Sequence, residues 1–229
     1  MHKNELSSIG KQTLLSDIIL GGQDGLVNVL GVILGVSAAT SDHKIIIAAG
    51  MAATFAESIS MGAVALTSKM ADRDHYYSEL AREKREIKEM PKIEKEEIRI
   101  AYKAKGFEGK ILNEIVNHIT SNNKQWLKFM MREELGLTEI KNKDIYSGSF
   151  IVGFSALVGS FVPLTPFFLL PVRSAVICSL AVSSVVLFFV GIYKAKVTIG
   201  NPFKTGIQMV LIGMGAALAG YYIGHFFGQ

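Results

Sequence analysis

Five long apolar runs constrain the fold of this 229-residue chain more than any other feature of its sequence. About 20 consecutive apolar residues, at 1.5 Å each, are enough for a helix to cross the hydrocarbon core of a bilayer. Runs of about this length lie at residues 18–41, 45–68, 146–168, 172–195 and 206–227. Backbone polar groups inside a bilayer must find internal partners, so such runs span as helices. The sequence therefore predicts an all-α membrane protein with five transmembrane helices.

Charged residues are concentrated in the middle of the chain. Residues 69–144 contain 17 of the 24 Lys and Arg and 15 of the 20 Asp and Glu. We therefore divide the chain into an N-terminal membrane segment (1–70), a soluble helical insert (71–144) and a C-terminal membrane segment (145–229). The net charge of +4 is not accompanied by any nucleic-acid-binding motif, so a nucleic-acid partner is not expected. The single cysteine, Cys178, lies in an apolar run and is expected to pack there.

The distribution of Lys and Arg predicts the orientation of the spans. With a cytoplasmic N-terminus, only Lys44 and Arg173 lie on the outer side, and the charged insert lies in the cytoplasm, as the positive-inside rule requires. Small residues at four-residue spacing, Gly31 and Gly35 in the first span and 216–228 in the last, predict close helix packing within or between subunits. Three prolines are expected to shape an external turn between the third and fourth spans: Pro163, Pro166 and Pro171.

Acidic residues inside two of the spans are the strongest indication of function. Asp24 lies in the first span and Glu57 in the second, where a charge costs at least roughly 2.5 kcal/mol. Helix-rise arithmetic places Asp24 level with Met61, and Asn28 level with Glu57 one turn deeper. Oxygen ligands together with a thioether favour a transition-metal ion over Mg²⁺ or Ca²⁺. Glycines 21, 22 and 25 leave the backbone around Asp24 free to unwind or to be approached closely. Ser58 and Ser60 are expected to donate hydrogen bonds between helices rather than to bind metal.

The insert is expected to continue the second span to about Met90 and then to form helices near 92–105, 108–120 and 124–135. Its acids recur at i, i+3 spacing, which places both members of a pair on one helix face. Carboxylates that converge from several helices bind iron or manganese in helical proteins, although a solvated, ion-paired surface would show the same spacing. The candidate metal ligands are Glu83, Glu86, Glu94, Glu97, Met130, Met131 and Glu134. His75 and His118 are weaker candidates, because neither has a partner histidine at metal-binding spacing.

Two other classes of protein remain as alternatives. A membrane-anchored metal buffer would use the insert but would leave Asp24 and Glu57 unexplained. An intramembrane acid hydrolase could use the same two acids as a dyad, yet the usual paired-aspartate motifs are missing from the sequence. The sequence has no phosphate-binding loop or nucleophile motif, so we do not expect an enzyme.

The order of several short motifs resembles the vacuolar iron transporter family over nearly the full length. The matching segments are Asp24-Gly25 in the first span, Ser-Met-Gly around Met61, Asp-His-Tyr at 74–76, and FMMREELGL at 129–137. The resemblance implies a five-span homodimer that moves Fe²⁺, and other divalent ions such as Mn²⁺, out of the cytosol in exchange for protons. In this view the metal is the substrate and no prosthetic group is expected.

The resemblance also implies a role for the candidate residues. The insert glutamates and Met130 would gather metal, while Asp24 and Met61 would bind it in the membrane. Eukaryotic relatives carry a membrane glutamate where this chain has Ala53, and Glu57 lies one turn later on nearly the same face. The host membrane would be the cell membrane in a prokaryote and the vacuolar membrane in a eukaryote.

Overall fold

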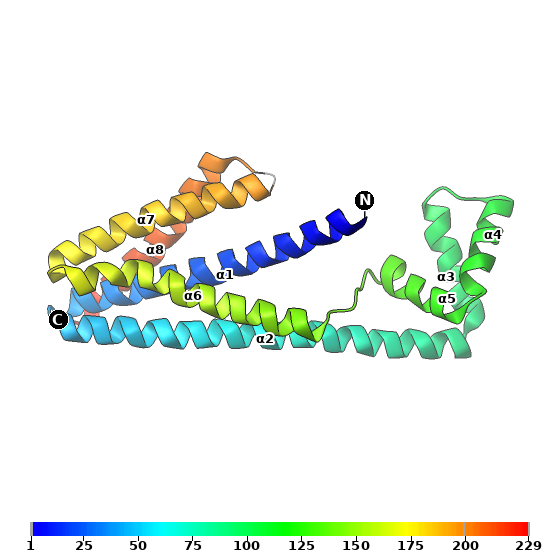
Figure 1. Ribbon diagram of the computed structural model, residues 1–229, viewed down its shortest axis with the longest axis horizontal. Coiled ribbons are helices and arrows are strands. Elements are labelled where there is room, and N and C mark those ends of the chain that lie inside the picture. Colours follow the sequence, from blue (N-terminus) through cyan, green and yellow to red (C-terminus); the bar gives the residue numbers. More distant parts are fainter. Residues whose placement is uncertain (1, 199, 229) are drawn as a thin grey trace. The chain divides into compact units, whose positions relative to one another are not determined.

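The computed structural model describes residues 2–198 and 200–228, with side chains from Thr13 onward, and all regular elements in this part of the chain are helical (Figure 1). The elements are α1 (His2–Ala39), α2 (His43–Glu89), α3 (Pro91–Ala104), α4 (Gly109–Thr120), α5 (Asn123–Phe129), the π-helix η1 (Met130–Glu134), α6 (Asn142–Leu169), α7 (Val172–Val197) and α8 (Pro202–Phe227). The described chain divides into two compact units. The membrane unit comprises the described residues up to Leu66 and from Tyr146 onward, and the insert unit runs from Thr67 to Ile145.

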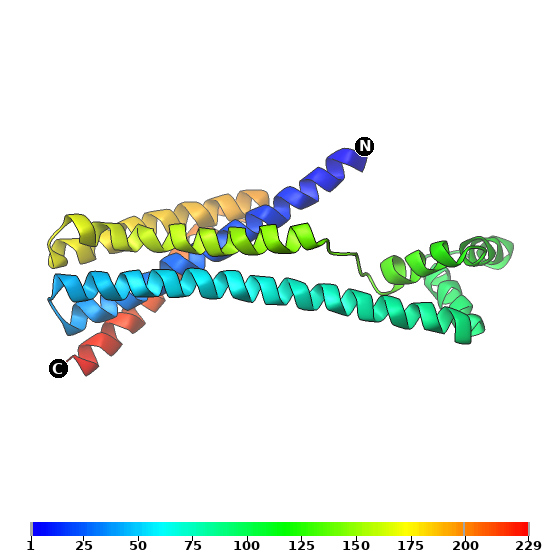
Figure 2. The same ribbon diagram turned by 60° about the horizontal axis from the view of Figure 1, so that its bottom comes forward.

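The prediction of five membrane-spanning helices is confirmed. The helices α1, α2, α6, α7 and α8 each contain a segment long and apolar enough to cross a bilayer (Figure 2). In α1 this segment begins at Thr13. The second span continues without a break to Glu89, as predicted, so that α2 contributes residues to both units.

The glycine stripes of α1 and α8 pack against each other inside the membrane unit. A β-carbon on Gly220 would collide with the carbonyl oxygen of Gly31, and one on Gly224 would collide with that of Gly35. Small residues allow two membrane helices to approach at backbone distance, where van der Waals contact and weak hydrogen bonds hold them together. The predicted packing role is therefore confirmed within one chain.

The prediction for the prolines is wrong for two of the three. Pro163 and Pro166 lie inside α6, and only Pro171 lies in the turn, as the N-cap of α7. A proline inside a helix removes one backbone N–H donor and leaves the carbonyl four residues earlier without its helical partner, but membrane helices tolerate this better than water-exposed helices do. Beside this proline, the Ser179 hydroxyl on α7 donates to the carbonyl oxygen of Pro163 at 2.7 Å, which ties α7 to α6.

The insert unit is built around its own apolar core. The helices α3 and α4 confirm the predicted segments, and α5 begins one residue early because Asn122 caps it by accepting hydrogen bonds from Lys124 N and Gln125 N. The predicted third helix changes at Met130 into a π-helical turn, in which Leu135 N donates to Met130 O at 3.0 Å. The core residues are Ile87, Ile98, Leu112, Val116, Ile119, Trp126, Phe129 and Met130.

Candidate functional site

The two intramembrane carboxylates lie close together in the membrane unit. Glu57 on α2 interacts with the side chains of both Asp24 and Asn28 on α1. Within α1, Asn28 Nδ2 donates to Asp24 Oδ2 at 3.3 Å. The depth arithmetic placed Glu57 level with Asn28 alone, whereas the structure brings it to both side chains. Met61 lies half-buried one helical turn beyond Glu57, and its role as a ligand stays a prediction.

The helix α6 sets the spacing of these two carboxylates. Gly21 lies three residues before Asp24, and Gly25 lies one residue after it. Neither has room for a β-carbon, because carbonyl oxygens of α6 lie against both. On α2, the Ser58 hydroxyl donates to the carbonyl oxygen of Gly153 on α6 at 2.8 Å, which confirms the predicted helix-to-helix role of this serine. Because α1 is unbroken through this region, its glycines serve close approach rather than unwinding.

The face that carries these side chains is open on the single chain. Asn28 is exposed, and Asp24 and Glu57 are half-buried. Ser60, on the same helix as Glu57, is also exposed. Polar groups at membrane depth are expensive when they face lipid, so they normally face a polar path or another protein surface.

Asp17 is an acid that the sequence reasoning passed over. It is only 9% exposed and lies on α1 seven residues before Asp24, which is two helical turns along the same face. The spacing of Asp17, Asp24 and Asn28, seven and four residues apart, is a helical spacing that could have revealed Asp17. It was passed over because it lies just before the apolar run that begins at residue 18.

The insert unit gathers a second group of carboxylates. Glu83 on α2 and Glu94 on α3 are each only 3% exposed, although both are charged residue types. One oxygen of each, Oε2, has no hydrogen-bond partner. Burying a carboxylate oxygen without a partner is costly, so this arrangement favours a cation between the two helices.

Arg82 is the resident cation beside this group. Its guanidinium pairs with Glu79 at 2.8 Å, with Glu83 at 3.1 Å and with Glu86 at 3.5 Å. Sequence reasoning singled out neither Arg82 nor Glu79, although Glu79 precedes Glu83 by one helical turn. The predicted pair Glu83 and Glu86 is therefore already partly neutralised within α2.

Mutual repulsion and burial raise the pKa values of the carboxyls that face this region. Desolvation and the charges of Glu97, Glu83, Glu86 and Glu134 raise the pKa of Glu94 to about 7. Desolvation by the surrounding protein and the charges of Glu97 and Glu83 raise the pKa of Glu134 to about 7, although this residue is exposed. Burial also raises the pKa of Glu97, with Glu83 and Glu86 adding to it. The five predicted glutamates of α2, α3 and η1 therefore act on one another electrostatically.

The two candidate methionine ligands of the insert are buried. Met130 is fully buried in the apolar core of the insert unit, and Met131 is 2% exposed beside it. Both belong to the π-helical turn that also carries Glu134. Turns of this kind occur frequently at functional sites, because the extra residue re-aims the side chains that follow.

Among the described residues, no three His, Cys, Asp or Glu side chains are already arranged around a common point that could hold a metal ion. His75 is exposed, and His118 lines a shallow surface depression with residues such as Tyr102 and Gln125. Metal binding at the insert would therefore require the glutamates to move closer together, which their present repulsion and their pairing with Arg82 oppose.

Comparison with known proteins decides the family. Residues 15–225 match the VIT family, a segment that includes both groups of carboxylates. The chain belongs to this family of vacuolar iron transporters. It is 34% identical over 209 residues to vacuolar iron transporter 1 of Tulipa gesneriana, covering 91% of this chain and 85% of the relative. The chain is also 32% identical over 209 residues to vacuolar iron transporter 1 of Arabidopsis thaliana, covering 91% of this chain and 84% of the relative. To protein CCC1 of Saccharomyces cerevisiae it is 28% identical over 219 residues, covering 91% of this chain and 67% of the relative.

Proposed function

We propose that this chain carries divalent transition-metal ions, with Fe²⁺ as the principal substrate, across a membrane in exchange for protons. The observation that carries the proposal is the contact of Glu57 with Asp24 and Asn28 among helices long enough to span a bilayer. A pair of carboxylates in a medium of low dielectric constant strongly favours a divalent cation. Relatives that are named vacuolar iron transporters support iron as the metal.

Proton exchange follows from the closeness of the two membrane carboxylates. A protonated carboxyl cannot bind a metal ion, so a proton and a metal ion compete for this pair. A metal ion that binds both groups must displace that proton. An acidic compartment on the far side would protonate the carboxylates again and release the metal there.

Met61 and the amide oxygen of Asn28 complete the proposed membrane ligands. A thioether is a soft ligand that binds Fe²⁺ and its neighbours in the transition series better than Ca²⁺ or Mg²⁺. Mn²⁺ is harder than Fe²⁺ and depends mainly on the carboxylates, so we propose it as a secondary substrate. Glu57 would replace, as a metal ligand, the membrane glutamate that eukaryotic relatives carry at the position of Ala53.

The insert would gather metal for the membrane path. Its glutamates come from α2, α3 and η1, and one oxygen of Glu83 and one of Glu94, Oε2 in each, lack hydrogen-bond partners. A divalent ion would relieve their repulsion and would compete with Arg82 for Glu83 and Glu86. Met130 and Met131 would have to turn out of the core to contribute sulfur.

We propose that the working protein is a homodimer in which the open face beside Asn28 meets a second chain. This face presents exposed polar side chains at membrane depth, which lipid would not accommodate. In a symmetric pair, the same patch on both subunits would meet itself and enclose a polar path between them.

The N-terminus and the insert are proposed to lie in the cytoplasm, because only Lys44 and Arg173 are basic on the opposite side. Metal would then move from the cytosol to the far side of the membrane, into the compartment that gives the relatives their name. A metal buffer without a path would leave the contact between Asp24 and Glu57 without a role.

Metal uptake into liposomes tests the proposed function. The full-length protein is reconstituted, and an internal chelating dye reports the entry of Fe²⁺, Mn²⁺, Co²⁺, Zn²⁺ and Ca²⁺ in parallel. We expect Fe²⁺ to enter, with slower entry of Mn²⁺ and none of Ca²⁺ above protein-free liposomes. Metal that binds to the protein without reaching the dye would support the buffer, and preferred entry of Ca²⁺ would overturn the role of the thioether.

A further inference from the structure

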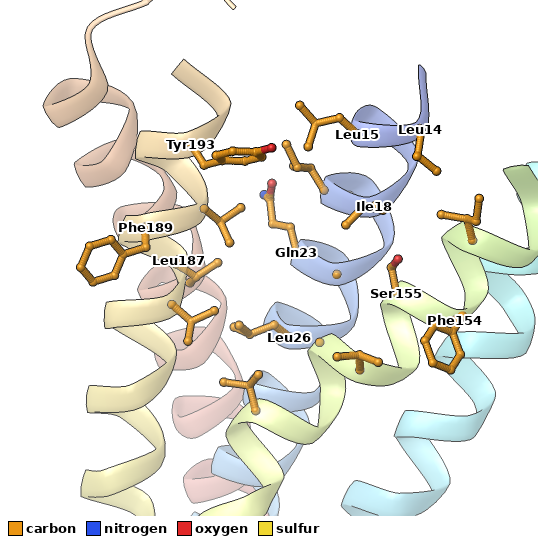
Figure 3. A pocket seen from close by; sticks show the side chains of 18 of the residues that line it. Leu14, Leu15, Ile18, Gln23, Leu26, Phe154, Ser155, Leu187, Phe189 and Tyr193 are labelled. Carbon is orange, nitrogen blue, oxygen red and sulfur yellow. The ribbon is translucent and has the colours of Figure 1, made fainter. Parts of the chain in front are cut away.

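A groove of about 690 Å³ lies among α1, α6 and α7 of the membrane unit, and Figure 3 shows its lining. Asp24 and Asn28 do not line it, so it is separate from the proposed metal path. Its lining is apolar except for three residues, one on each helix: Gln23, Ser155 and Tyr193. The volume falls within the range of about 300 to 1,000 Å³ that is usual for small-molecule sites.

The floor of the groove is formed where α1 and α6 approach each other at glycines. Gly22 on α1 and Gly159 on α6 both line it, and a β-carbon on Gly159 would collide with the carbonyl oxygen of Gly22. Aromatic rings stand above this floor, including Phe150 and Phe154, which stack with their centroids 6.0 Å apart. Phe150 is 71% exposed and Phe189 on α7 is 62% exposed, so the walls open toward the surroundings of the helices.

The groove is about as long as one leaflet of a bilayer is deep. Its lining on α1 runs from Leu14 to Leu26, which corresponds to about 18 Å along the helix. Half of the hydrocarbon core of a bilayer is about 15 Å. An occupant that matches this shape is long, thin and apolar, as a phospholipid acyl chain is.

A polar side chain closes one end of the groove, and a lysine follows just beyond its lining. Figure 3 shows Tyr193 near Leu15 at this end, and the side chain of Gln23 pointing toward it from deeper in the groove. Lys196 follows Tyr193 by three residues, so it lies about one helical turn further along the same side of α7, and it is exposed. Tyrosine and lysine are the residues that anchor membrane helices at the level of the lipid headgroups.

We propose that this groove binds an acyl chain of an anionic phospholipid whose phosphate group pairs with Lys196. Basic side chains at the end of a pocket between membrane helices favour anionic headgroups, and anionic lipids are enriched in the cytoplasmic leaflet. With the N-terminus in the cytoplasm, as proposed, Lys196 lies at this cytoplasmic leaflet. The lipid would fill the gap between α6 and α7 and steady α1, which supplies both the floor of the groove and, on another side, Asp24.

Native mass spectrometry of the full-length protein tests the proposal. The protein is extracted from liposomes of equal phosphatidylglycerol and phosphatidylcholine, and the retained lipids are counted for each chain. We expect retained phosphatidylglycerol in the wild type, a drop of about fivefold in its preference over phosphatidylcholine in Lys196→Gln, and loss of both lipids in Val190→Trp, which fills the groove. The fivefold figure corresponds to about 1 kcal/mol for one lysine near an anionic surface.

Two matched variants control for general effects. Lys204→Gln removes an exposed lysine from the start of α8, and Ile177→Trp adds the same bulk to an exposed position of α7 outside the groove. Both should retain lipid as the wild type does. Equal retention of the two lipids by the wild type, full retention by Val190→Trp, or dissociation of a dimer by Val190→Trp would each overturn the proposal, the last because a second chain would then occupy the groove. Because Lys196 is exposed, its variant tests the headgroup contact even if Val190→Trp does not fold.

Discussion

The molecule holds acidic side chains in two places, and the two differ in what balances their charge. In the insert unit, Arg82 pairs with three glutamates, and Glu94 and Glu134 have pKa values raised to about 7. In the membrane unit, Glu57 has Asp24 and Asn28 as its side-chain partners. The proposed metal binding at the insert would therefore be an exchange with a resident cation and with protons. At the membrane pair, no basic side chain is among these partners, so the proposed exchange there is between metal and protons alone.

Removing one charge from the membrane pair is the most severe test of this difference. Asp24→Asn should reduce Fe²⁺ uptake into liposomes by about 70-fold or more, because a divalent ion would lose roughly 2.5 kcal/mol or more of compensation at low dielectric. Metal binding to the insert, measured by calorimetry on the same protein, should not change. Glu114→Gln, which alters an exposed acid of α4, is the control. Uptake by Asp24→Asn close to that of the wild type would remove Asp24 from the path.

Neutralising the insert should separate binding from transport. Glu94→Gln combined with Glu97→Gln should weaken metal binding to the protein by about tenfold or more, since a single charged ligand contributes at least about 1.5 kcal/mol. Flux at saturating metal should fall much less, because Asp24 and Glu57 remain. Glu96→Gln is a matched control, since Glu96 lies between the two on α3 but is exposed and paired with Arg99. Equal effects of Glu96→Gln and the double variant would mean that the insert is only a charged surface.

The pH dependence of the insert follows from its raised pKa values. Glu94 and Glu134, with pKa values of about 7, are mostly protonated at pH 5.5, so metal must displace protons there. We expect the affinity of the insert for Co²⁺ or Mn²⁺ to fall as the pH is lowered from 7.5 to 5.5, by up to about tenfold per pH unit for each proton displaced.

Without metal, stability should change in the opposite direction. The folded state binds more protons than the unfolded state between the ordinary glutamate pKa of 4.5 and about 7. The free energy of unfolding should therefore fall as the pH rises through this window. Thermal unfolding at several pH values measures this change, and Glu94→Gln should flatten it. A metal-free protein that gains stability from pH 5 to pH 7 would contradict the raised pKa values.

Replacing the resident cation should have the smallest effect. Arg82→Gln removes the partner that holds Glu79, Glu83 and Glu86, so metal affinity should rise a few fold while the metal-free protein loses stability. Calorimetry and thermal unfolding measure the two changes. Arg99→Gln, which breaks an exposed pair on α3, should alter neither by more than a small amount. A loss of metal affinity in Arg82→Gln would show that the arginine organises the site instead of competing with metal.

The sequence predicted most of the fold because its signals are local. The five spans follow from apolar runs, and α3 and α4 follow from Pro91 and the glycines at their ends. The prolines of α6 were misplaced because proline is a local helix-breaking signal, whereas a membrane helix can continue through it. The π-helical turn at Met130 depends on packing in the core of the insert, and no local signal marks it.

The candidate site was less predictable for the same reason. Helix periodicity placed Asp24, Asn28 and Glu57 at neighbouring depths, but which helix faces meet is decided by contacts with α6 at Gly21, Gly25 and Ser58. In the insert, i, i+3 spacing found the glutamates. It could not show that Arg82 would pair with three acids on its own helix, since each of several basic residues nearby could have done so.

Proton-coupled uptake by the full-length protein tests the central claim most directly. Liposomes with an acidic interior and an internal pH dye receive Fe²⁺ from outside, while valinomycin and potassium hold the membrane voltage constant. The account predicts faster uptake than in liposomes without a pH gradient, with protons leaving as metal enters, and it predicts that Glu57→Gln weakens this coupling while the insert still binds metal. Fe²⁺ uptake by the wild type that is indifferent to the pH gradient would contradict exchange and would describe a passive channel instead.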